Sequence, residues 1–294
     1  MSRSANAAVI LALCSDLCVS GDAAPLTPEE WGTLAGRLLA EGLKPEDLPG
    51  LSRLDLGGRL RMPGADADRL LRLLDREASL SFELSRLENT GICAVTRADP
   101  EYPARLKAVL GNGCPPVLYA AGALSLLRYR YVGVVGSAPA LPEDLQFTER
   151  VVSEIAAQGY GVVSGGSEGI ETAAVERALA AGMPAVEYRS GAMLRRLQKG
   201  AAVRAVSGGA LLLLSAIRPD AGIETAAALQ RNRYLYAQSC GVVVVNAEPE
   251  SGAVWAGAME NLQHGWCREF CRAGDPRPGV RSLIGAGALP VEVG

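Results

Sequence analysis

Two glycine-bearing turns are the parts of this sequence best suited to bind an anion. Each follows an apolar, β-branched run and precedes a helical pattern. Glycines let backbone N–H groups approach an anion, and a helix N-terminus adds partial positive charge. A tight strand-to-helix turn without a ligand is an equally good interpretation, and neither turn is a GxGxxG or Walker loop. The phosphate-binding candidates in these turns are Gly136, Ser137, Ser164, Gly165, Gly166 and Gly169.

A second group of candidates surrounds an asparagine at positions 231 to 233. Arg231 and Arg233 flank Asn232, and guanidinium groups can grip phosphate or carboxylate through two hydrogen bonds. In a helix the two arginines point about 200° apart. One is therefore expected to face a ligand while the other supports the structure, although a solvated pair is the simpler alternative.

The third feature is a run of one charge sign between Glu187 and Asp220, which holds six cations and no acid. A solvated helix face explains such a run, and so does an anionic partner. The cations that we expect to help bind a polyanion are Arg195, Arg196 and Lys199.

Composition narrows the classes of function. The formal net charge is −3, so a polyanion site must be local rather than a property of the whole surface. His264 is the single histidine, which argues against Ser-His-Asp chemistry, and its spacing from Cys267 and Cys271 fits no common zinc site. Seven cysteines in a chain of 294 residues are typical of reduced, cytoplasmic thiols.

Short apolar strands alternate with helices from about residue 91 onward. This alternation predicts an α/β fold, a doubly wound and mostly parallel sheet whose ligands bind beyond the carboxyl ends of the strands. The clearest helices are 142–158 and 170–181. The expected strands are 131–135, 160–163, 185–188, 210–214 and 242–246.

Residues 1 to 90 have a helical pattern and are expected to form a separate small domain, followed by an α/β domain over 91–294. Thr27 begins a capping box with Glu30. The apolar run 7–14 ends before Asp16, so an amphipathic helix is favoured over a signal sequence. A further helix is expected over 68–88.

The order of motifs resembles the DNA-processing protein A (DprA, or Smf) family over about residues 92 to 290. The resemblance implies an extended Rossmann-like domain that binds single-stranded DNA, forms a homodimer and helps to load a RecA-type recombinase during DNA processing and natural transformation. It implies no enzymatic activity, metal or cofactor, and it adds Ser251 and Gly252 to the candidate site. The winged helix of some members would follow residue 294. The motifs are Asp99–Pro103, Pro115–Tyr119, Val135–Ser137, Ser164-Gly165, Gly169-Ile170, Arg231–Arg233, Ser251-Gly252 and Leu283-Ile284 with Gly287-Ala288.

Of the positions that depart from the family pattern, three bear directly on DNA binding. Ala138 stands where the family usually has its main phosphate-binding arginine, Glu168 where an arginine often precedes Gly-Ile, and Ala228 where an aromatic residue can stack on a base. Each lost phosphate contact lowers the salt dependence of binding by about one unit, and a lost stacking residue costs about 1–3 kcal/mol per base. We therefore expect weakened binding of single strands.

Two other functions compete with DNA binding. A sensor of a small nucleotide-like ligand is favoured by Glu168, because a carboxylate suits a ribose hydroxyl better than a phosphate. A nucleotide-cleaving enzyme would need Glu168 or Glu171 as a base. No second catalytic group lies at motif spacing, so this possibility ranks last.

Overall fold

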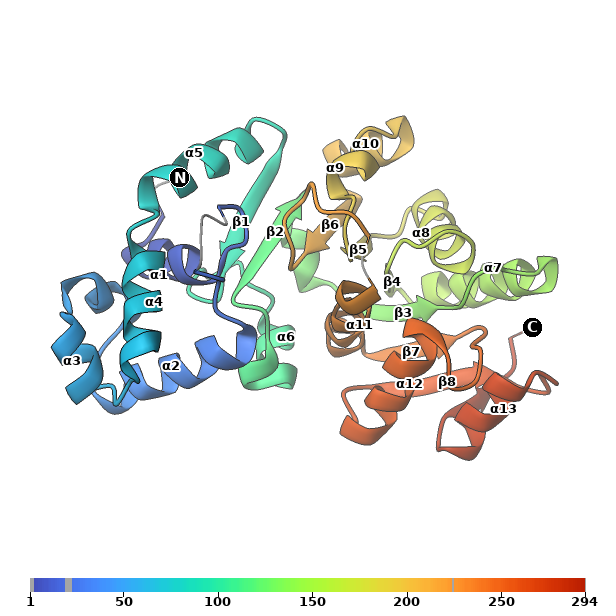
Figure 1. Cartoon of the computed structure of the whole chain (residues 1–294). Coiled ribbons are helices and arrows are strands. Elements are labelled where there is room, and N and C mark those ends of the chain that lie inside the picture. Colours follow the sequence, from blue (N-terminus) through green and yellow to red (C-terminus); the bar gives the residue numbers. More distant parts are fainter. Residues whose placement is uncertain (1–2, 19–22, 224, 294) are drawn as a thin grey trace. The chain divides into compact units, whose positions relative to one another are not determined.

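The computed structural model describes residues 3–18, 23–223 and 225–293 and contains two compact units (Figure 1). The first unit comprises Met1–Ala120 with Ala216–Arg218, and the second comprises Ala121–Ser215 with Pro219–Gly294. The domain boundary expected near residue 90 stays a sequence-based prediction.

The first part of the chain is mainly helical, and its helices precede two neighbouring strands. The predicted capping box is confirmed: the Thr27 hydroxyl accepts from the Glu30 N–H at 3.2 Å, and the Thr27 N–H donates to the Glu30 carboxylate at 2.8 Å. The elements are α1 (Ala5–Cys14), α2 (Pro28–Ala40), η1 (Pro45–Gly50), α3 (Arg53–Gly58), α4 (Gly64–Leu74), α5 (Glu77–Glu88), β1 (Ile92–Thr96), α6 (Ala104–Leu110), η2 (Gly111–Gly113) and β2 (Val117–Ala121).

Two expectations for these helices were wrong. Helix α1 is not amphipathic, because nearly every side chain from Ala7 to Leu13 is buried. The single helix expected over 68–88 is two helices, α4 and α5, interrupted at Arg76. The buried Arg76 guanidinium donates to the carbonyls of Ala12, Ser15 and Cys18 at 2.6–2.7 Å. The break between α4 and α5 therefore places Arg76 where its side chain satisfies backbone carbonyls at the end of α1 and in the loop that follows.

The second unit contains the predicted parallel sheet. Its strands lie in the order β6-β5-β4-β3-β7-β8-β9, and the paired strands run parallel. Strand β3 matches its predicted range, and the other four predicted strands are found with ends shifted by one or two residues. The elements are η3 (Leu124–Arg128), β3 (Tyr131–Val135), α7 (Pro142–Ala157), β4 (Gly161–Ser164), α8 (Ile170–Ala180), β5 (Ala185–Arg189), α9 (Met193–Arg196), α10 (Gly200–Ser207), β6 (Leu211–Ser215), α11 (Thr225–Gln238), β7 (Gly241–Val244), α12 (Gly252–His264), β8 (Arg268–Arg272), α13 (Pro278–Gly285) and β9 (Leu289–Val291).

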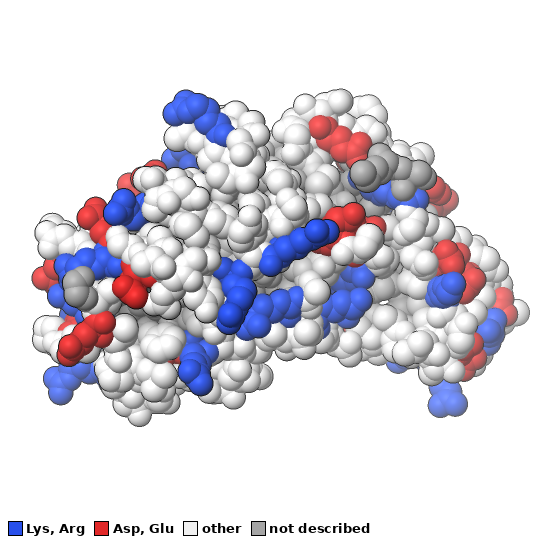
Figure 2. Space-filling view, turned by 180° about the vertical axis from the view of Figure 1, so that it is seen from behind, with Lys and Arg blue, Asp and Glu red and all other residues white. Residues whose placement is uncertain are grey.

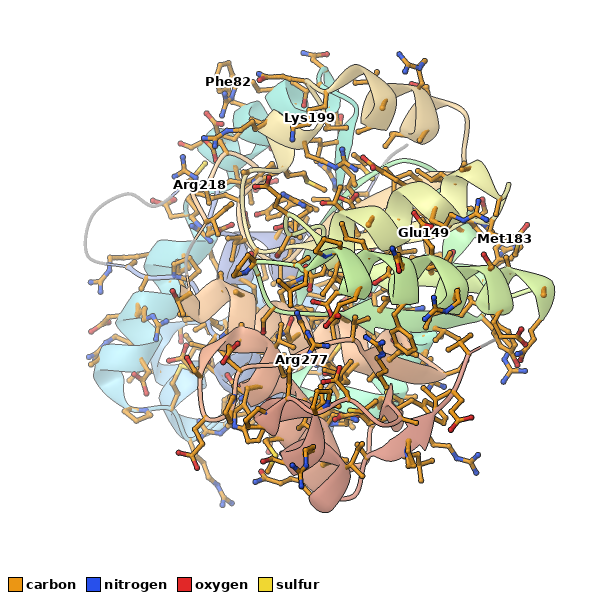
Figure 3. The ribbon with its side chains drawn as sticks, turned by 90° about the vertical axis from the view of Figure 1, so that its right-hand side faces the viewer. Phe82, Glu149, Met183, Lys199, Arg218 and Arg277 are labelled. Atoms are coloured by element: carbon orange, nitrogen blue, oxygen red, sulfur yellow. The ribbon has the colours of Figure 1, made fainter. Side chains whose placement is uncertain are left out.

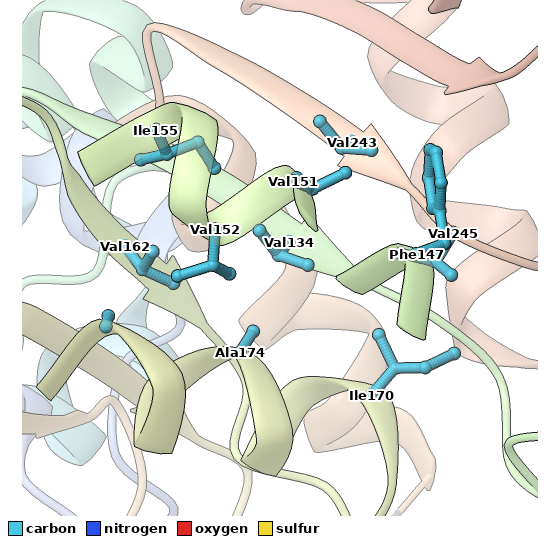
Figure 4. Close-up of a cluster of buried hydrophobic side chains, with 11 residues drawn as sticks. Val134, Phe147, Val151, Val152, Ile155, Val162, Ile170, Ala174, Val243 and Val245 are labelled. Atoms are coloured by element: carbon cyan, nitrogen blue, oxygen red, sulfur yellow. The ribbon is translucent and has the colours of Figure 1, made fainter. Parts of the chain in front are cut away.

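Helices cover both faces of this sheet. Val134 faces α7 and α8 in a core that includes Phe147 and Val151 (Figure 4). Neighbouring residues of a strand point to opposite faces, and a Cβ added at Gly133 would lie 3.1 Å from a methyl group of Leu235 on α11. Glycine at this position therefore allows α11 to pack closely on the other face.

The strand order places the two predicted turns at one edge of the sheet. The chain runs outward from β3 through β4 and β5 to β6, then returns to β7 on the other side of β3. The carboxyl ends of parallel strands share one edge, and ligands of such sheets bind there. Both turns follow carboxyl ends at this edge, the first after β3 and the second after β4.

The described residues include no helix that is long and apolar enough to cross a membrane.

Candidate functional site

Five charged side chains gather beyond β4 and β5 and are called here the charge cluster: Glu171, Glu187, Arg189, Arg196 and Arg231. Glu187 lies on β5 and its side chain is fully buried. Arg196 of α9 donates to both of its oxygens, with Nη2–Oε1 at 2.6 Å and Nε–Oε2 at 3.0 Å. This hydrogen bonding raises the pKa of Arg196. Arg196, expected to contact DNA, is thus held by a carboxylate of its own chain.

Arg231 reaches from α11 to α8, where its Nη1 lies 3.1 Å from Oε2 of Glu171. The same oxygen accepts the Ser167 N–H at 2.9 Å. A carboxylate of the chain therefore occupies the place beside the α8 N-terminus where an anionic ligand was expected. Gly165 leaves the space that this ion pair occupies, because an added Cβ would lie 0.8 Å from Arg231 Nη1.

Arg189 lies at the end of β5 and is paired less completely. Its Nη1 donates to the carbonyl oxygen of Gly166 at 2.7 Å and lies 3.4 Å from Glu187 Oε2. Its Nε is buried and has no hydrogen-bond partner in the part of the chain that the structure describes. Burial lowers the pKa of Arg189, while the nearby charge of Glu187 raises it.

The first turn belongs to a separate polar network at the ends of β3 and β7. The Ser137 N–H donates to Oδ1 of Asn246 at 2.6 Å, and Nδ2 of Asn246 donates to Asp144 at 3.0 Å. Asp144 is fully buried and pairs with Arg277 at 2.7 Å. Arg277 is labelled in Figure 3. Gly136 is packed against Ile170. The Ser137 N–H is therefore already used within the chain.

The remaining predicted residues of the arginine and α12 motifs hold helices together or lie at the surface. The buried Asn232 donates to the carbonyl of Ala253 at 2.6 Å, which ties α11 to the start of α12. Arg233 pairs with Glu260 of α12 at 2.7 Å. Arg231 and Arg233 thus point toward different neighbours, as their helical spacing predicts. Ser251 and Gly252 are exposed at the start of α12.

Arg195 and Lys199 are exposed, whereas the side chain of Arg196 between them is largely buried. Lys199 is labelled in Figure 3. The basic run is therefore not a continuous surface patch. On the face drawn in Figure 2, basic and acidic side chains both appear among larger uncharged areas. Of the glycine-turn residues, Ser164 is buried and its hydroxyl donates to the Val134 carbonyl at 2.6 Å, while Gly169 has φ 92° at the start of α8.

Sequence reasoning missed the carboxylates that neutralise the predicted arginines. Glu187 was noted only as the boundary of the basic run, although its place inside the apolar strand Ala185–Arg189 was a usable signal. A charge in a buried strand needs a partner of opposite sign. Asn246 gave no comparable signal, because one asparagine after a strand is common.

Among the described residues, no group of three or more His, Cys, Asp or Glu side chains is placed to hold a metal ion. The cysteines form no disulfide within the described ranges. Glu168 is exposed, so its suggested contact with a ribose stays a prediction.

Comparison with known proteins identifies the family. The model of the DNA recombination-mediator protein A family matches residues 93–265, more than half of the 294 residues. The chain belongs to this family. A search of curated proteins finds no match.

Two solved structures share the fold. DNA processing protein A from Streptococcus pneumoniae is 23% identical with a TM-score of 0.66, and the match covers 92% of this chain and 96% of that one. The Helicobacter pylori protein, whose structure is described for its mode of single-stranded DNA binding, is 22% identical with a TM-score of 0.54, covering 67% of this chain and 89% of that one. These matches agree with the α/β, Rossmann-like fold.

Proposed function

We propose that this chain is a DNA-processing protein that binds single-stranded DNA at the carboxyl edge of its parallel sheet and acts by binding rather than by catalysis. The observation that carries the proposal is the family match over residues 93–265. The solved Helicobacter pylori relative, described as binding single-stranded DNA, supports it.

The charged residues suggest how strong this binding is. Arg195 and Lys199 are exposed and can approach phosphates without losing an internal partner. Arg233 would leave a partly exposed carboxylate, whereas Arg196 and Arg231 would have to leave buried ones. Breaking a buried ion pair is costly, so fewer phosphates are contacted than the sequence alone suggests. We expect an affinity that is low and falls with salt.

The test is binding of fluorescent oligo-dT by anisotropy at low and moderate salt, beside a duplex of equal length. The wild-type chain should bind the single strand more tightly than the duplex. Charge reversal at Arg195 and Lys199 to Glu should remove about two phosphate contacts, or about 1.4 units of the salt slope.

The matched control reverses Arg150 and Arg177, which are exposed on α7 and α8. It changes the net charge by the same amount and should bind nearly as the wild type does. Equal losses in the two double variants would indicate a general charge effect without a local site. Absence of oligo-dT binding by the wild type at low salt would rule out the proposed function.

The finer role is loading of a RecA-type recombinase by a cytoplasmic homodimer, as in DNA processing and natural transformation. The family assignment supports it. Light scattering should give twice the mass of 30.6 kDa. Recombinase filaments should form faster on single strands precoated with a single-strand-binding protein when this chain is added. A monomer without effect on filament formation would limit the role to DNA binding.

A further inference from the structure

The charge cluster contains one more cation than anion. Three arginines face two glutamates, so one positive charge is left over. The five side chains are only 0–12% exposed. An uncompensated charge with so little access to water is unfavourable unless an anion comes to it.

The distances indicate which cation is in excess. Arg196 engages both oxygens of Glu187, and Arg231 engages Glu171. Arg189 has only a 3.4 Å approach to Glu187 and otherwise donates to backbone carbonyls. Glu176 also acts on Arg196, but it is exposed and water screens its charge.

Two N–H groups of the cluster are not satisfied by the described residues. The Nε atoms of Arg189 and Arg231 are buried without hydrogen-bond partners among the described residues. The Arg231 side chain is 6% exposed. The positive charge of Arg231 also lowers the pKa of Arg189. Unpaired donors beside an excess positive charge are what a phosphate oxygen would complement.

We propose that Arg189, together with Nε of Arg231, binds a single phosphate group of a DNA strand. The inference rests on the proposed function and adds Arg189 to it, a residue that the family motifs do not include. Glu171 and Glu187 limit the site to one phosphate, because they repel a second anion. One backbone phosphate of the DNA therefore binds within the charge cluster, and exposed residues contact the other phosphates.

The test uses two substitutions with opposite expected effects on oligo-dT binding. Arg189→Met keeps the bulk of the side chain, removes the excess charge and should weaken binding about tenfold. It should also lower the salt slope by about 0.7. Glu187→Gln leaves one more uncompensated cation and should strengthen binding. A purely structural cluster would predict weaker binding in both variants, and that result would overturn the inference.

The control is Arg177→Met, in the last turn of α8, which lies toward the opposite edge of the sheet from the cluster. It should bind as the wild type does. Circular dichroism and the thermal midpoint establish that each variant folds. If Arg189→Met folds and binds oligo-dT normally, the phosphate contact is wrong while the proposed function stands.

A wild-type chain that binds no oligo-dT would contradict the proposed function instead. The cluster is then tested with inorganic phosphate alone. Phosphate should raise the thermal midpoint of the wild type and not that of Arg189→Met, and equal shifts in both would overturn the site as well.

Discussion

At the residue scale, the sequence showed which residues could bind an anion, but it did not show which of them are paired with another residue of the chain. Arg195 and Arg196 are neighbours on α9, yet the first is exposed and the second is bound to Glu187. Cations that are neighbours in the sequence therefore differ in the folded chain, since one is exposed and the other is paired with a buried carboxylate. The pairing depends on β5 and α9 meeting in space, which no local pattern of residues encodes.

Gly165 offers a test at this scale. Substitution by alanine places a methyl group where Arg231 Nη1 now lies, 0.8 Å from the added Cβ. Arg231 must then leave Glu171, and separating a buried ion pair costs about 3–5 kcal/mol. Urea unfolding should report a loss of this size for Gly165→Ala.

Gly36→Ala is the matched control, because it lies within α2 and an added Cβ there meets nothing within 4 Å. This change should leave stability unchanged or raise it by about 0.5–1 kcal/mol. A loss below about 1 kcal/mol for Gly165→Ala would mean that Arg231 relaxes without leaving its partner, contrary to the tight packing inferred here.

At the element scale, hydrophobic periodicity predicted the helices whose ends depend on nearby residues. It did not predict a helix end that depends on a contact with a distant part of the chain. The expected ranges of α7 and α8 each differ from the structure by one residue at the C-terminus. The break between α4 and α5 was missed because its cause is the set of carbonyls from Ala12 to Cys18, far away in sequence. The apolar run of α1 did carry a signal that was overlooked, because a helix that is apolar on all sides is typically buried.

Arg76→Met tests the role of that break. The substitution removes hydrogen bonds from a charged donor to three carbonyls, each worth about 1.5–3 kcal/mol. Because such contributions are not additive, we expect an overall loss of about 3 kcal/mol in urea unfolding. Arg72→Met, on the exposed side of α4, should change stability by less than about 0.5 kcal/mol. Similar values for both would remove the argument for a buried clamp.

At the scale of the whole molecule, the sequence predicted the architecture much better than the site. Alternating strands and helices specified the parallel sheet and the edge at which the glycine turns meet. The assumption that these turns offer free N–H groups did not hold for Ser137, whose N–H is engaged by Asn246. The net charge of −3 limits how positive the surface can be, but it does not show where on the surface the positive charge lies.

Stability of the whole chain should depend on pH through Glu269. Burial against α12 raises its pKa from 4.5 to about 7, although a hydrogen bond from Asn261 opposes this shift. The folded chain therefore keeps a proton that the unfolded chain releases above pH 4.5. The free energy of unfolding should fall between about pH 4.5 and 7, by at most about 3 kcal/mol, and this contribution should be constant above pH 7.

Urea unfolding of the wild type and of Glu269→Gln at pH 5 and pH 8 measures this contribution. The wild type should lose more stability than the variant on going to pH 8, because the amide does not titrate. Glu248→Gln, at an exposed position, should follow the wild type. Parallel pH dependences for the wild type and Glu269→Gln would show that Glu269 is ionised with an ordinary pKa.

The ion pair between Asp144 and Arg277 has a consequence for shortened chains. Asp144 belongs to the first turn of α7, whereas Arg277 directly precedes α13. A fragment that stops before Arg277 would keep every strand from β3 to β8 but leave a fully buried carboxylate without its cation. The smallest stable fragment of this unit must therefore reach Arg277 and cannot stop at the end of β8.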